Sequence, residues 1–123
     1  MQHQNPRLDS INARALDFMC LVLDPFVPSL PDGPGLRRIA DQLVGAAGGI
    51  GSNPEEAQAS SSRREFVRFC EIALRESRES NFRLTVCKRT GLGDQACEKL
   101  LGEGPQIARI IATIVINTKR NGL

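Results

Sequence analysis

The stretch LVGAAGGIGSNPEEA, residues 43–57, has four glycines within seven positions, a composition that can cradle a phosphate group. A dinucleotide fingerprint needs G-x-G-x-x-G after a strand, and a P-loop needs G-x-x-x-x-G-K-[ST]. Here Gly49-Ile50-Gly51 is followed by Ser-Asn-Pro, and no Lys-Ser or Lys-Thr pair follows. Because the preceding residues also repeat with a helical period, we expect no nucleotide site and no catalytic site in this stretch.

As a helix, the same stretch has one face that is almost bare of side chains. The side opposite Leu43, Ala47 and Ile50 carries Gly45, Gly48, Gly49 and Ser52. Each glycine costs about 1 kcal/mol relative to alanine inside a helix. Glycine is tolerated where another backbone must come close, so we expect this face to pack, and a neighbouring subunit is the favoured partner.

Metal and acid–base chemistry lack the residues they need. The cysteines show no CxxC spacing and stand alone at Cys20, Cys70, Cys87 and Cys97. The only histidine is His3, so no zinc set and no Glu-x-x-His pair of a di-iron bundle can form on an ordered helix. Glu55 and Glu56 are adjacent and therefore point apart. We expect reduced thiols used for packing, no metal, no cofactor and no enzymatic activity.

The arginines of the third apolar-periodic segment form the strongest candidate for binding. At 100° per residue, five of them fall within an arc of about 80°: Arg64, Arg68, Arg75, Arg78 and Arg89. Glu71 is the only acid in that arc. Guanidinium groups on one face can bind the phosphates of a nucleic acid, or an acidic protein.

A solvated helix face is the alternative interpretation of these arginines. Glu65, Glu76 and Glu79 flank the arc and can pair with arginines one turn away. Aromatic stacking, which single-strand recognition also uses, is nearly missing, since the chain has no Trp or Tyr and only Phe82 projects toward the arginines.

Composition predicts a single soluble domain. The 123 residues are 41% hydrophobic and 24% charged, with a net charge of +2. The longest apolar run, residues 110–116, is far below the roughly 18 residues of a membrane span. The first ten residues lack the layout of a secretory signal, so we expect a cytoplasmic protein with no membrane partner.

Four helical segments follow from the period of the apolar residues. We expect an all-α, up-down-up-down four-helix bundle as one domain over residues 1–123, with a flexible tail at 1–8 and helices at about 9–27, 36–53, 62–90 and 94–120.

Individual residues set the expected ends of these helices. Asp9, Ser62 and Asp94 are predicted N-caps, and Ser62 forms a capping box with Glu65. Gly91 is the predicted stop of the third helix. Two prolines are expected to interrupt helices. Pro54 ends the second helix, and Pro105 kinks or restarts the fourth.

More apolar surface is present than one bundle can bury. The first helix carries a second apolar strip beside its core strip, and Ile116 faces away from Ile107 and Ile114. A lone bundle would leave this surface wet. The candidate subunit interface is therefore Leu16, Cys20, Leu23, Val27, Gly45, Gly48, Gly49 and Ile116.

Two stretches resemble a known bacterial family. REFVRFCEIAL, residues 64–74, is similar to a pattern of a basic residue, E-F, an aliphatic, a basic residue, F, then I-A-L. QLVGAAGGIGSNPEE, residues 42–56, falls where that family reads like Q-L-R-R-A-A-x-S-I-P-x-N-I-A-E-G. Both are typical of the four-helix-bundle proteins encoded in intervening sequences of large-subunit ribosomal RNA genes, relatives of the accessory variability proteins of diversity-generating retroelements.

The resemblance implies a small non-enzymatic bundle that assembles into a homopentameric ring. In the retroelement branch, such a ring binds nucleic acid and a reverse transcriptase. Val44-Gly45 replaces the basic pair that the family commonly carries, which weakens the inference of nucleic-acid binding.

Two hypotheses remain: an oligomeric scaffold that binds RNA or DNA through its arginine face, and a structural protein-partner module with no nucleic-acid binding.

Overall fold

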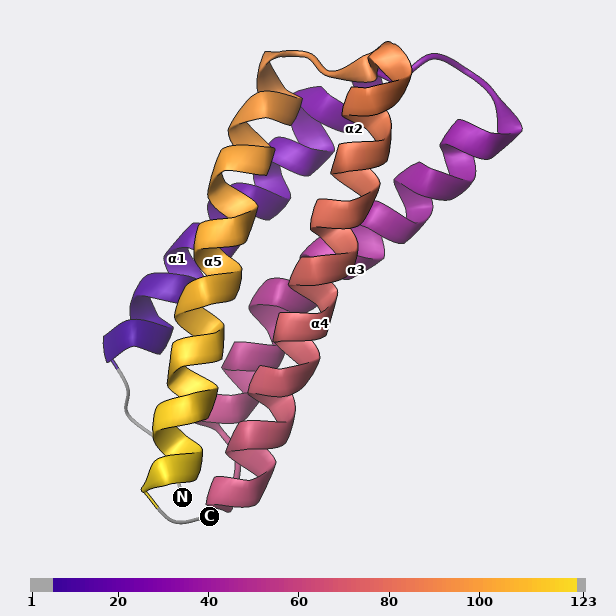
Figure 1. The fold of residues 1–123 in the computed structure, drawn as a ribbon. Helices are drawn as coiled ribbons and strands as arrows, with labels where there is room; N and C mark the ends of the chain where they lie inside the picture. Colours follow the sequence, from indigo (N-terminus) through magenta and orange to yellow (C-terminus); the bar gives the residue numbers. More distant parts are fainter. Residues whose placement is uncertain (1–5, 122–123) are drawn as a thin grey trace.

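The structure, a computed structural model, describes residues 6–121, and every regular element in that range is helical (Figure 1). The elements are α1 (Pro6–Leu21), η1 (Val22–Phe26), α2 (Val27–Ser29), α3 (Pro34–Gln58), α4 (Arg63–Cys87), η2 (Lys88–Leu92) and α5 (Gln95–Arg120). The four long helices alternate in direction along one bundle. The expected all-α four-helix bundle is therefore confirmed for the described residues.

The core forms where the apolar faces of the four helices meet. Each long helix contributes fully buried side chains, among them Leu8, Phe18, Leu43, Ile50, Leu84, Leu100, Ile107 and Ile111. α1 packs against α3 and α5, and α4 packs against the same two helices from the other side. α1 and α4 thus lie on opposite corners of the bundle. Within residues 6–121, no helix combines the length and apolar character that crossing a membrane requires.

α1 begins earlier than the sequence predicted. The helix starts at Pro6 rather than at Asp9, and Leu8, assigned to a flexible tail, is completely buried. Proline suits the first helical turn because its missing N–H would have no partner there. Residues 1–5 of the expected tail, with His3, lie outside the described residues.

The first helix also breaks before its expected end at residue 27. Asp24 has φ −158° and ψ 116°, which is extended backbone inside η1. The ring of the following Pro25 clashes with a helical conformation of the preceding residue, so the chain bends here. The helix then resumes as the short α2.

α3 is longer than predicted at both ends, and Pro54 lies inside it. Pro54 removes one backbone donor, yet its ring is buried and α3 continues to Gln58. The side-chain amide of Asn53 donates to the carbonyl of Gly49 at 2.9 Å. The turn after Pro54 buries Ala57 completely, so packing outweighs the lost hydrogen bond.

The predicted caps of the last two long helices are confirmed. The Ser62 hydroxyl accepts from the Glu65 N–H at 3.1 Å, and the Asp94 carboxylate accepts from the Cys97 N–H at 2.8 Å. Gly91 adopts φ 86°, the left-handed conformation that stops a helix. α4 itself ends at Cys87 and continues as η2, a wider π-helical turn. α5 continues through Pro105 without the expected restart.

Candidate nucleic-acid interface

The five arginines of the predicted stripe all point to solvent. Those within α4 lie on the side opposite its buried residues, such as Ala73 and Leu84, and all five side chains are exposed: Arg64, Arg68, Arg75, Arg78 and Arg89. The first four belong to α4. Arg89 lies in η2, so its direction is no longer set by the α-helical period that placed it on the predicted arc.

Three acids close to these arginines have other partners, and one of them, Glu65, accepts a hydrogen bond from the Ser61 hydroxyl at 2.8 Å. The Glu71 carboxylate pairs with the Lys119 ammonium of α5 at 3.0 Å. The Glu79 carboxylate lies 3.9 Å from the Arg83 guanidinium, at the edge of α4 that faces α3. Across residues 6–121, none of the ion pairs includes an arginine of the stripe.

Glu76 is held on the α3 side of α4. A Cβ added to Gly49 would lie 2.8 Å from the Glu76 Cγ, so this side chain fills the space that the glycine leaves. Burial raises the pKa of the Glu76 carboxyl, and the nearby Glu79 adds to the rise, while Arg75 and Arg83 oppose it.

Phe82 lies on the same outward surface of α4. Its side chain is 68% exposed, and it is the one aromatic residue among the large exposed apolar side chains of the described chain. It follows Arg78 by one helical turn. The surface formed by the four α4 arginines, Arg89 and Phe82 is called the arginine face below.

The apolar interface candidates come from both the first and the last segments of the bundle. Leu16 is 64% exposed, Leu23 49% and Ile116 52%, and Cys20 is also exposed. Ile116 lies on α5, three residues before the Lys119 that contacts α4. Val27 follows the break at Asp24 and packs half-buried against the core, and its place in the subunit interface stays a prediction.

The candidate-interface glycines of α3 differ in what surrounds them. Gly49 packs under Glu76 of α4, so the face at this position is covered by a side chain of the same chain rather than bare. A Cβ at Gly45 or Gly48 would meet nothing within 4 Å. Gly48 lines a groove of about 240 Å³ between α1 and α3, and Leu16 lines its other wall.

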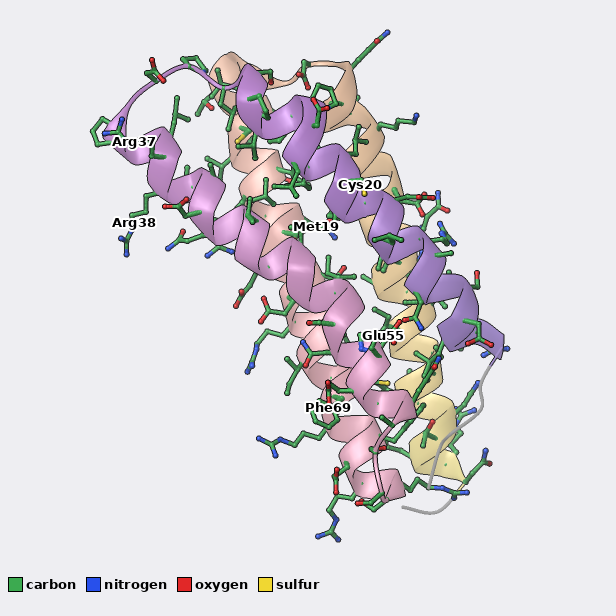
Figure 2. The ribbon with its side chains drawn as sticks, turned by 180° about the vertical axis from the view of Figure 1, so that it is seen from behind. Met19, Cys20, Arg37, Arg38, Glu55 and Phe69 are labelled. Carbon is green, nitrogen blue, oxygen red and sulfur yellow. The ribbon has the colours of Figure 1, made fainter. Side chains whose placement is uncertain are left out.

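Figure 2 looks onto this groove, with α1 and α3 in front. Met19 points from α1 toward α3, Glu55 lies on the α3 side, and Cys20 faces outward from α1. The structure therefore brings together two of the predicted interface residues, Leu16 and Gly48, from helices that are distant in sequence.

A larger groove between α1 and α5 was missed by sequence reasoning. It has a volume of about 500 Å³ and is lined by residues that include Cys20, Asp24 and Lys99. The ion pair between Arg14 and Glu103 spans it. Its lining comes from two segments about 80 residues apart, and its charges are of both signs, so no local pattern indicates it.

Three of the four thiols are buried, as their expected use in packing requires, while Cys20 is exposed. All four cysteines are free, and Cys70, Cys87 and Cys97 are buried. Burial raises the pKa of the Cys70 thiol to about 12 and that of the Cys97 thiol to about 11. Within residues 6–121, no group of His, Cys, Asp and Glu side chains is placed to hold a metal ion.

Fold and surface together define a small all-α bundle with an exposed cationic face on its third long helix. A family model described as 23S rRNA-intervening sequence protein matches residues 11–113, and the chain belongs to this family. The match extends from α1 into the second half of α5, so it covers all four long helices.

A solved structure supports the same fold. The crystal structure of a protein of unknown function from the S23 ribosomal protein family of Bacteroides thetaiotaomicron superimposes with a TM-score of 0.75. The two sequences are 21% identical over 85% of this chain and 97% of that one. No curated protein sequence matches this chain. The relationship to accessory variability proteins stays a prediction.

Proposed function

We propose that the protein is a non-enzymatic, oligomeric scaffold that binds nucleic acid through the arginine face. The observation that carries the proposal is the pairing of charges around α4. Within residues 6–121, the five exposed arginines take part in no ion pair, while Glu71 and Glu79 pair with Lys119 and Arg83. The positive charge of this face is therefore available to an external anion.

The spacing of the arginines suits a polyanion better than a small ligand. At 1.5 Å per residue, Arg64 and Arg78 are about 21 Å apart along α4. A small phosphate ester could contact two of these side chains at most. A nucleic-acid backbone presents a charge every few ångströms and can engage the whole row.

The second part of the proposal is that the bundle associates with copies of itself. Leu16 of α1 and Leu23 of η1 are exposed, and Leu16 lines the same groove as Gly48. Because α1 and α4 occupy opposite corners, subunits that meet through α1 leave the arginine face free. A pentameric ring, as the family resemblance implies, would repeat this face and raise its avidity for a long strand.

Salt dependence tests the nucleic-acid half of the proposal. If five arginines each neutralise a phosphate of a single strand, log K falls with log[salt] with a slope of about −3.5. Replacing Arg68, Arg75 and Arg78 by Glu leaves two contacts and a slope of about −1.4. Fluorescence anisotropy with labelled RNA and DNA, between about 50 and 200 mM salt, measures both slopes.

The control replaces Lys99, Arg109 and Arg120 of α5 by Glu, which changes the net charge by the same amount at exposed positions elsewhere. We expect this variant to bind nearly as the parent does. If the parent and the α4 triple variant bind equally, the arginine face is only a solvated surface and does not bind nucleic acid. No binding by the parent at low salt would favour the alternative, a protein-partner module without nucleic acid.

A further inference from the structure

Packing within the bundle does not explain why the Phe82 side chain is exposed. An apolar ring that is 68% exposed contributes little to the bundle core. It lines neither of the two grooves described above. Arg78 lies one turn before Phe82 on the outward side of α4, and Arg75 two turns before it, so the ring lies among cations.

This half of the arginine face also lacks acids. From Arg75 to the end of α4, the acids are Glu76 and Glu79, and both are turned toward α3. The remaining outward residues are Arg78, Phe82 and Thr85, which is exposed as well. A ligand that covers this surface must supply negative charge and also a planar apolar group.

Single-stranded nucleic acid supplies both. Resting on the proposed function, we infer that the arginine face takes single strands, with an unstacked base covering the Phe82 ring while Arg75 and Arg78 bind the flanking phosphates. The bases of a duplex are already stacked on each other and cannot cover the ring. α3 and α5 flank α4, so α4 also cannot enter a major groove as a freestanding helix.

Matched probes separate the base contribution from the phosphate contribution. We would compare three probes: an oligothymidylate of about 20 nucleotides, an abasic phosphodiester of the same length, and a duplex. A strand of this length covers one binding site. A stacked base adds roughly 5- to 150-fold in affinity. The parent should prefer the oligothymidylate to the abasic strand by a factor in this range.

Phe82→Leu keeps an apolar side chain but removes the stacking surface, so its preference for the strand with bases should vanish while its salt slope stays unchanged. Thr113→Leu is the control, because it places a leucine at an exposed α5 position outside both the arginine face and the candidate subunit interface, and it should keep the preference. Unaltered thermal melting of both variants verifies that the bundle is intact.

The outcomes distinguish the two proposals. If the parent binds oligothymidylate and the abasic strand equally, or prefers the duplex, the single-strand inference is wrong while nucleic-acid binding stands. If Phe82→Leu retains the preference, the ring is not the stacking surface. If the parent binds none of the three probes at low salt, the proposed function itself fails.

Discussion

At the scale of single residues, the arginine face depends on where neighbouring carboxylates point. Glu71 lies on the same side of α4 as the arginines, yet Lys119 of α5 holds its carboxylate. Glu76 fits against Gly49 of α3. A side chain larger than hydrogen at position 49 would compete with Glu76 for this space. Contacts with the two flanking helices therefore draw Glu71 and Glu76 away from the arginines of their own helix.

Two glycines of α5 allow a sharp test of the packing between α4 and α5. A Cβ at Gly104 would lie 2.0 Å from the Asn81 Oδ1, whereas a Cβ at Gly102 would meet nothing within 4 Å. We expect Gly104→Ala to lower the free energy of unfolding by about 1–2 kcal/mol through overpacking. Gly102→Ala should raise it by about 1 kcal/mol through helix propensity.

Urea denaturation of both variants measures the difference. Asn81→Ala combined with Gly104→Ala should recover stability relative to Gly104→Ala, because the clashing amide is gone. A Gly104→Ala variant as stable as Gly102→Ala would contradict the close approach of the two helices.

The cysteines should differ sharply in reactivity. Thiolate is the reactive species, and burial raises the pKa of Cys70, Cys87 and Cys97, so these thiols stay protonated and shielded near pH 8. Cys20 is exposed on α1. A chromogenic disulfide reagent should react rapidly with one thiol of the native protein and with all four in denaturant. Rapid labelling of a second thiol without unfolding would show that the core is open.

At the scale of elements, local capping and tertiary packing each determine different helix ends. Ser62 and Asp94 act within one turn, so their caps could be predicted from neighbouring residues. Pro54 could not be interpreted in this way. A local rule ends the helix there, but the buried Pro54 ring and Ala57 keep the chain helical for another turn.

The Ser62 cap provides the test at this scale. Ser62→Ala removes the acceptor for the Glu65 N–H and should cost about 1 kcal/mol of stability. Ser62→Asp retains an acceptor at the N-cap and should restore most of it. Thermal melts of the two variants provide the comparison. Equal losses in both would show that the hydroxyl acts through another contact than the cap.

At the scale of the whole molecule, the diagonal arrangement of α1 and α4 separates two surfaces. The exposed leucines lie on the α1 side and the arginine face on the α4 side. One molecule can therefore associate with its own copies and with an anionic ligand at the same time. The proposed assembly would not block the proposed binding.

Light scattering on variants tests this separation. Leu16→Glu with Leu23→Glu places charges in the proposed subunit contact, where burying them unpaired is costly, and should shift the protein to monomers. Thr85→Glu with Thr90→Glu, exposed positions of α4 and η2, adds the same charge and should leave the assembly intact. A parent protein that is already monomeric would remove the assembly from the proposal.

The sequence by itself determined the properties that act over one or two helical turns. The period of apolar residues predicts four helices and most of their buried faces, and Ser62, Asp94 and Gly91 set ends within their own turns. The same period placed the four α4 arginines correctly on the outward side.

Only the tertiary structure decided which distant residues meet. It placed Glu76 against Gly49, joined Leu16 and Gly48 in one groove, and paired Glu71 with Lys119. These contacts depend on how far neighbouring helices are shifted along and rotated about their axes. Helices pack about 8–10 Å apart, and at that distance many side chains must fit together at once to fix the shift and the rotation. No single turn of sequence contains that information.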